Sequence, residues 1–260
     1  MKIGICAKVT ADTDARLSPS SDGTSFSFTG KTVVGPYDEF AVEEAVKTKE
    51  SHGGDLVVLS VGKSDDVLPS LRSGVLARGA DKAVVVEDAA LESADSLGIA
   101  RALAKAIEKE ELNIVFCGKQ SIDDENVQVP GMVADLLGWA LVSRVIEFSL
   151  EGDSFTATRS MDGGVRQVVK GSLPAVITAE RGLNTPRYAK LPAIMKAKKK
   201  PVDTVDLAAL SLSGDDVAPK LSVGAYGTPP ERPKGRILEG DTDAVVAELV
   251  KLLREEAKVI

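Results

Sequence analysis

The sequence has 260 residues, a formal net charge of −7 and 43% hydrophobic residues, so one sizeable buried core is expected. The acidic balance argues against nucleic acid as a partner, and no run of about 18 apolar residues is present to span a membrane. Only 4% of the residues are aromatic, so aliphatic side chains must form the core, as in parallel sheets covered by helices.

Strand and helix patterns alternate over the first half of the chain. A first strand is expected at 3–9, with no signal-peptide pattern before it. The next expected elements are a helix at 38–50, a strand at 56–61, a helix at 65–78, a strand at 82–86, a helix at 96–110, a strand at 114–117 and a helix ending at Gly138. This alternation predicts an α/β fold with a parallel sheet, whose ligands bind at the carboxyl ends of the strands.

The second half has a different texture. Strands are predicted at 156–160, 166–170 and 175–179, and Asp162-Gly163-Gly164 suits a hairpin turn. Beyond about Pro201 the chain becomes irregular, and it closes with a helix at 242–257. We therefore predict one domain over residues 1–200 and a C-terminal arm over residues 201–260.

The two cysteines and the single histidine give little sign of chemistry. Cys6 and Cys117 lie in separate apolar runs without metal-ligand spacing, so two buried thiols are expected rather than a disulfide framework or a zinc site. His52 lies in a turn-like segment, where a solvated side chain is expected. Neither a metal site nor a catalytic triad is predicted.

The stretch from Gly118 to Pro130 follows a buried strand and leads into a helix. Free N–H groups at a helix N-terminus suit a phosphate, although the stretch has neither the GxGxxG nor the Walker spacing. Asp123, Asp124 and Glu125 would repel a phosphate unless they point away or bind ribose hydroxyls. A nucleotide site and an acid-rich surface loop both remain open, whereas consecutive acids rarely converge on one metal ion.

A second stretch, residues 186–200, carries apolar side chains beside a cluster of lysines. One interpretation is an exposed protein-docking segment that presents Tyr188, Leu191, Ile194 and Met195. The other is a short helix that packs most of these apolar side chains into the core and leaves the lysines solvated. The sequence pattern favours neither.

With these stretches in view, the sequence resembles the β subunits of electron transfer flavoproteins. The segments that carry the resemblance are Gly118-Lys119-Gln120-Ser121-Ile122-Asp123-Asp124, Asp162-Gly163-Gly164, Leu173-Pro174-Ala175-Val176-Ile177-Thr178-Ala179, Leu183-Asn184, Pro186-Arg187-Tyr188, Leu191-Pro192 and Ile194-Met195-Lys196-Ala197-Lys198-Lys199-Lys200. Further family-like segments are Asp38-Glu39, Ala41-Val42-Glu43-Glu44-Ala45 and Gly79-Ala80-Asp81. The resemblance covers nearly the whole chain, and its most specific part is residues 186–200.

The resemblance implies a fold, a partner and an electron path. The fold would be Rossmann-like, of the adenine nucleotide α-hydrolase-like kind, with the 201–260 arm embracing an α subunit that carries FAD. This chain would hold a structural AMP. Electrons would arrive from acyl-CoA dehydrogenases of fatty acid β-oxidation and related flavoenzymes and pass to a quinone oxidoreductase, so the subunit would be a carrier rather than an enzyme. We expect a cytoplasmic bacterial protein, with the mitochondrial matrix as the alternative location.

The resemblance also implies site residues. The nucleotide would lie against Cys6, Ala7, Lys8, Gly35, Pro36, Tyr37, Asp38, Val61, Gly118, Lys119, Gln120, Ser121, Ile122, Asp123, Asp124, Glu125, Asn126, Val127, Gln128 and Val129. This site would be built mainly from backbone, with Asp123 and Gln128 as candidates for polar contacts. The docking residues would be Tyr188, Leu191, Pro192, Ile194, Met195 and Lys196, with Leu191 as the anchor.

Several positions depart from the family pattern. Val127, Val129 and Pro130 stand where the family usually has Asn, Thr and Gly, and Thr13 stands where many relatives place a tyrosine near the flavin. Pro130 has no N–H for a phosphate, although proline suits the first turn of a helix. The pair Gln128-Val129 is closer to electron-bifurcating relatives, which hold a second FAD in place of AMP and oxidise NADH. That is one alternative function, and a stand-alone adenine-nucleotide-binding protein of the stress type is the other.

Overall fold

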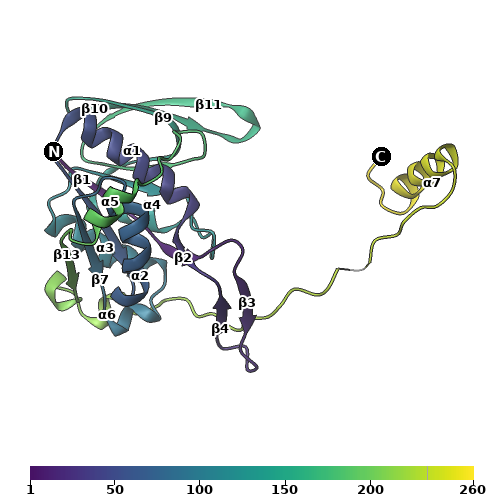
Figure 1. Ribbon diagram of the computed structural model, residues 1–260, viewed down its shortest axis with the longest axis horizontal. Helices are drawn as coiled ribbons and strands as arrows, with labels where there is room; N and C mark the ends of the chain where they lie inside the picture. The colour runs from purple at the N-terminus through teal and green to yellow at the C-terminus, as the bar shows by residue number, and fades with distance from the viewer. Residues whose placement is uncertain (233) are drawn as a thin grey trace.

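The computed structural model describes residues 1–232 and 234–260 (Figure 1). Its main element is a nine-stranded sheet with the order β11-β10-β9-β12-β8-β1-β6-β7-β13. The sheet strands are β1 (Lys2–Cys6), β6 (Asp55–Val61), β7 (Lys82–Val86), β8 (Ile114–Gly118), β9 (Ala140–Glu151), β10 (Ser154–Ser160), β11 (Arg166–Ser172), β12 (Ala175–Ala179) and β13 (Val202–Val205). The helices are α1 (Pro36–His52), α2 (Ser64–Leu71), α3 (Ser96–Lys109), α4 (Val129–Leu137), α5 (Leu191–Ala197), α6 (Gly214–Val217) and α7 (Thr242–Glu255).

Helices cover both faces of the sheet. One core cluster joins strand residues such as Ile3 and Phe116 to apolar side chains of α1, α2 and α5. The other joins alternate strand residues such as Leu59 and Val115 to α3, α4 and α6. Because both faces are buried, the central strands are continuous apolar runs, which is why the sequence revealed them. The predicted α/β, Rossmann-like fold is confirmed.

One edge of the sheet is an antiparallel extension. β9, β10 and β11 form a meander that joins the parallel part through β12 (Figure 1). The strands predicted at 156–160, 166–170 and 175–179 correspond to β10, β11 and β12, and Asp162–Gly164 turns between β10 and β11. β9 has twelve residues and was not predicted.

Two expected elements are shorter than predicted. β1 ends at Cys6, and residues beyond it turn away so that β2 (Val9–Ala11) pairs with β5 (Thr32–Val34). α2 ends at Leu71 and continues as a π-helical turn, Arg72–Leu76. A small hairpin of β3 (Arg16–Pro19) and β4 (Phe26–Thr29), which was not predicted, projects from the domain (Figure 1).

The boundary predicted at residue 201 falls inside the domain. β13 pairs with β7 in the main sheet, because Val202 to Val205 align with Ala83 to Val86. Val217 at the end of α6 is fully buried in the cluster around α3. The arm therefore starts after Val217, and it ends in α7, which stands apart from the sheet (Figure 1) and has no buried residue. Among the described residues, no helix combines the length and the apolar character needed to cross a bilayer.

Candidate functional site

A large cavity opens at the carboxyl ends of β1, β6 and β8. β1 lies between β8 and β6, so the chain leaves β1 towards one side of the sheet and later returns on the other. Such a switch point is where ligands bind in open α/β sheets. The cavity has a volume of about 950 Å³, which lies within the range of small-molecule sites.

Asp38, near the start of α1, joins the ends of the two central strands. One carboxylate oxygen accepts the Gly118 N–H at 2.7 Å, and the other accepts the Lys8 N–H at 2.9 Å. Gly118 allows this close approach, because a Cβ at that position would lie 2.6 Å from the Asp38 carboxylate and 2.8 Å from its backbone nitrogen. A single buried carboxylate therefore fixes the geometry of the cavity floor.

Burial raises the pKa of Asp38 to about 7, although the amides of Lys8 and Gly118 favour its charged form and act in the opposite direction. A carboxyl group whose pKa is higher in the folded protein binds a proton that the unfolded chain has lost. Its contribution to stability is therefore complete below about pH 4 and is lost as the pH rises to about 7.

Asp38→Asn is expected to lower the free energy of unfolding by about 1–3 kcal/mol, because an amide NH₂ must then face one of the two backbone N–H donors. The deficit should be larger at pH 5 than at pH 8, since only the wild type loses stability over that interval. Urea unfolding curves of both proteins at the two pH values measure this. Equal stability of the two proteins at both pH values would show that the carboxylate does not hold the strand ends.

The loop after β8 directs its acids towards a lysine. Lys8 Nζ lies 2.8 Å from an oxygen of Asp123 and 3.1 Å from Asp124. Burial opposes the charge on Lys8, but these carboxylates outweigh it and raise the pKa of Lys8. Lys8, which follows β1, thus partly neutralises two of the three successive acids that would repel a phosphate.

Further along, the loop adopts backbone conformations that side chains seldom take. Glu125 and Val127 have φ values of 49° and 56°, and Val127 is exposed. α4 then begins at Val129 with Pro130 in its first turn, and both residues line the cavity. The N-terminal end of a nine-residue helix therefore faces the cavity, where its remaining free N–H groups favour an anion.

The structure places most of the predicted nucleotide residues around this cavity. Those that line it are Cys6, Ala7, Lys8, Asp38, Val61, Gly118, Gln120, Ser121, Asp124, Asn126, Val127, Gln128 and Val129. Those outside its lining are Gly35, Pro36, Tyr37, Lys119, Ile122, Asp123 and Glu125. Lys119 is directed elsewhere, because its Nζ pairs with Glu180 at 2.8 Å and lies 4.5 Å from the centre of the Tyr37 ring.

Two walls of the cavity were not predicted. One is the start of α3 with the preceding loop, including Asp95, which caps the helix by accepting the N–H groups of Leu97 and Gly98. The other is the first part of the arm, residues 219–226, which contributes Leu221 and Tyr226. Asp95 connects the two walls, because it also accepts the Lys220 N–H at 2.7 Å. The capping residue before α3 was visible in the sequence, whereas the irregular arm gave no signal.

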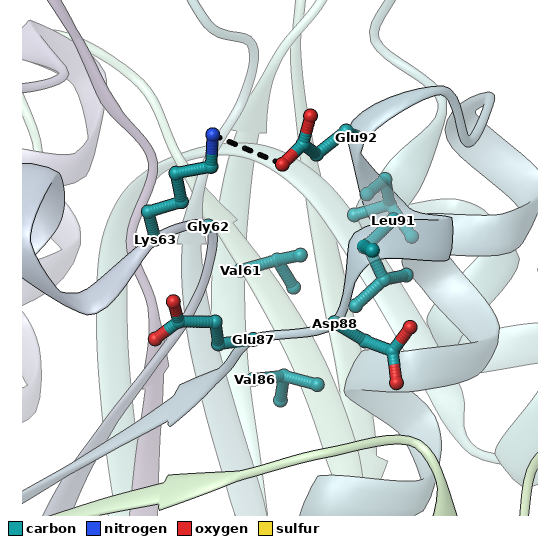
Figure 2. Close-up of a pocket in the computed structure, with 10 residues that line it drawn as sticks. Val61, Gly62, Lys63, Val86, Glu87, Asp88, Leu91 and Glu92 are labelled. Carbon is teal, nitrogen blue, oxygen red and sulfur yellow. Dashed lines mark ion pairs between the residues drawn. The ribbon is translucent and has the colours of Figure 1, made fainter.

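A second, smaller cavity of about 290 Å³ adjoins the first at the ends of β6 and β7. Figure 2 shows it, with Glu87, Asp88 and Glu92 around it and an ion pair of 3.0 Å from Lys63 to Glu92 at one side. Val61 and Ile99 line both cavities.

The segment before α5 is anchored on α1. The Arg187 guanidinium binds Glu43, with Nε 2.9 Å from a carboxylate oxygen, and also binds Glu50. Asn184 donates to the backbone oxygen of Phe40 and to the carboxylate of Glu44, each at 2.9 Å. Burial of Glu43 and hydrogen bonds from Arg187 make this a paired, desolvated contact. Asn184 and Arg187, which belong to the segments that carry the family resemblance, therefore fix the position of the chain before α5.

α5 itself presents one face outwards. Its C-terminal end is fixed by Arg72, which donates to the Ala197 backbone oxygen at 2.7 Å, and Ala197 is fully buried. Ile194 packs half-buried against the core. By contrast, Leu191 is 73% exposed, Met195 56% and the preceding Tyr188 93%. The structure thus contains the short helix of one interpretation and the exposed apolar surface of the other.

The parallel sheet, its switch-point cavity and the helices on both faces define an α/β protein of the Rossmann-like class. A family profile described as "Electron transfer flavoprotein domain" matches residues 25–210. The chain is 35% identical to the electron transfer flavoprotein subunit beta of Bacillus subtilis and 38% identical to that of Bradyrhizobium diazoefficiens, each over 100% of both chains. It is 41% identical to that of Mus musculus over 86% of both chains.

The chain therefore belongs to the electron transfer flavoprotein β-subunit family, which confirms the resemblance found in the sequence. Because the bacterial relatives match over the full length, arm included, the stand-alone stress-type alternative is set aside.

Proposed function

We propose that this chain is the β subunit of a heterodimeric electron transfer flavoprotein. It accepts electrons from acyl-CoA dehydrogenases and other flavoprotein dehydrogenases, and it passes them to a quinone oxidoreductase. An α subunit holds FAD, while this chain holds AMP and presents the surface on which the dehydrogenase docks. The chain acts as a carrier and contributes no catalytic residue.

The observation that carries the proposal is the apolar stripe of α7. Val246, Leu249 and Val250 are exposed, and no residue of the helix is buried. An amphipathic helix of this kind becomes stable when its apolar stripe packs against another surface. The α subunit is the proposed surface, because relatives that match over the whole chain are named as one subunit of an electron transfer flavoprotein.

AMP is proposed for the cavity at the ends of β1 and β8. The N-terminal end of α4 suits its phosphate, and residues of β1 and of the loop after β8 line the cavity. Of the two side chains expected to make polar contacts, Gln128 lines the cavity and Asp123 is paired with Lys8 outside it. Gln128 is therefore the better candidate for a contact with the nucleotide.

Purification with the α subunit, followed by denaturation and chromatography of the released ligands, is expected to yield one FAD and one AMP per heterodimer. The cavity of this chain holds one nucleotide, the proposed AMP. The FAD belongs to the α subunit, which is the second chain that the apolar stripe of α7 is proposed to bind. The chromatogram identifies each ligand by its retention and absorbance. A preparation without any adenine nucleotide would refute the AMP assignment.

An electron-bifurcating subunit is the second candidate. It is favoured by the extra space beside the main cavity, since the smaller cavity shares Val61 and Ile99 with it, and FAD is larger than AMP. The same chromatogram decides between the two candidates. Two FAD molecules per heterodimer, together with oxidation of NADH, would establish bifurcation in place of the simple carrier.

A further inference from the structure

The only two cysteines of the sequence lie side by side at the floor of the main cavity. Cys6 at the end of β1 is the register partner of Cys117 in β8. Residues paired in this way on parallel strands point to the same face of the sheet. Both thiols belong to the face that packs against α3 and α4. The sequence had indicated two separate, inert thiols, because nothing local reveals that these strands are neighbours.

The spacing of the strands suits a bond between the two sulfurs. Neighbouring strands lie about 4.8 Å apart, and disulfides join Cα atoms that are about 4.4–6.8 Å apart. The neighbouring Cys6 thiol, and then burial, raise the pKa of Cys117 well above its usual value. Cys117 therefore stays protonated and is the poorer initiator of any reaction.

The surrounding residues hold the pair in place. Asp38 binds the N–H of Gly118, which follows Cys117, and the N–H of Lys8, two residues after Cys6. The carboxylate thus clamps the two strand ends together at the position of the thiols. Both cysteines line the cavity of about 950 Å³, and Cys6 is the more exposed of the two. A small reagent that enters the cavity meets Cys6 first.

We propose that Cys6 and Cys117 are a dithiol that a peroxide oxidises to an intramolecular disulfide. The Cys6 thiolate attacks one peroxide oxygen and becomes a sulfenic acid, and the hydroxide that leaves takes up the proton lost by the thiol to form water. The Cys117 sulfur then attacks the Cys6 sulfur, its proton leaves with the hydroxyl group as a second water, and the disulfide forms. Two thiols lose two electrons and two protons, and one hydrogen peroxide is reduced to two waters.

A nucleotide in the cavity shields this dithiol, a statement that rests on the function proposed above. The wall residues of the cavity and the two thiols surround the same space. Only the empty fraction of the protein then reacts. With AMP at about 100 times its Kd, that fraction and the oxidation rate should both fall about 100-fold.

The test treats the heterodimer, freed of bound nucleotide, with hydrogen peroxide and then labels remaining thiols with N-ethylmaleimide under denaturing conditions. Intact mass spectrometry of this chain is expected to show the loss of two hydrogens and no label. Cys117→Ala should stop at a sulfenic acid on Cys6 that reacts with dimedone. Cys6→Ala should keep its thiol and take up one label, because the remaining sulfur is buried.

Each other outcome overturns part of the proposal. Two labels on the oxidised wild type, or separate oxidation of both sulfurs without a disulfide, would rule out the dithiol. A reactive Cys117 in Cys6→Ala would overturn the order of attack. AMP binding is followed in parallel by calorimetry. Bound AMP that leaves the oxidation rate unchanged would overturn the shielding, whereas AMP that fails to bind would contradict the proposed function while the mass still decides the disulfide.

Discussion

Replacing Leu191 with alanine is expected to slow reduction by the dehydrogenase about tenfold or more. Leu191 is 73% exposed on α5, whose C-terminal end and preceding segment are both anchored, and burying a leucine in a partner pocket is worth roughly 1.5–3 kcal/mol. A difference of 1.4 kcal/mol is a factor of about ten. Pro192 restrains the backbone beside it, so less ordering entropy is lost on docking. Stopped-flow reduction by the dehydrogenase measures the effect.

The thermal stability and the flavin spectrum of the Leu191→Ala protein should match the wild type, because the side chain contributes little to the core. Ile194→Ala on the same helix is the matched control. Its side chain packs half-buried against the core, so it should lower the free energy of unfolding, by less than the roughly 2–5 kcal/mol of a fully buried site. A clear fall in Tm for Leu191→Ala with normal reduction by the dehydrogenase would end the docking assignment.

Removing residues 235–260 is expected to weaken binding of the α subunit by about 100-fold. Three apolar side chains of α7 are about half exposed, so burying the rest of each is worth roughly 1 kcal/mol, about 3 kcal/mol in all, which is a factor of about 100. The remaining domain should unfold at an unchanged temperature, because no residue of α7 is buried in it. Sedimentation or calorimetry with the separate α subunit gives the affinity, and circular dichroism gives the Tm.

Two point variants separate the apolar stripe from the mere presence of a helix. Leu249→Ser removes an exposed apolar side chain, and Lys251→Ser changes a residue two positions further on, which lies on nearly the opposite side of the helix. Only the first should weaken binding. If the truncated chain binds the α subunit as tightly as the full chain, the arm does not hold that partner.

The parts of the fold that the sequence could predict are those with a local pattern. β6 and β8 are continuous apolar runs bounded by helices, and both were found nearly at their true ends. β9 escaped because Ser143 and Arg144 interrupt its apolar pattern, and Arg144, at φ 58°, lies where the register to β12 shifts. β13 has only two apolar residues, and its partner β7 lies far earlier in the chain.

In the candidate site, too, the residues with a local sequence pattern were predicted and those placed by distant contacts were not. A glycine after a buried strand, followed by a helix, was enough to find the loop after β8. The contribution of the arm could not be found, because Leu221 and Tyr226 lie in an irregular stretch whose place depends on contacts such as that of Tyr226 with the β3–β4 hairpin. The exposure of Leu191 also depended on tertiary contacts, since only the anchoring of α5 decides which of its side chains face inward.

α1 connects the proposed nucleotide cavity to the proposed docking helix α5. Near its start, Asp38 sets the floor of the cavity, and one to three turns further on, Glu43 and Glu50 hold Arg187 and with it the segment that leads to α5. An α-helix rises 1.5 Å per residue, so Asp38 and Glu50 are separated by about 18 Å along a stiff rod. The helix therefore sets a fixed distance between the cavity floor and the segment that leads to α5. If a dehydrogenase docks on α5 as proposed, α1 would keep it at a set distance from a nucleotide in the cavity.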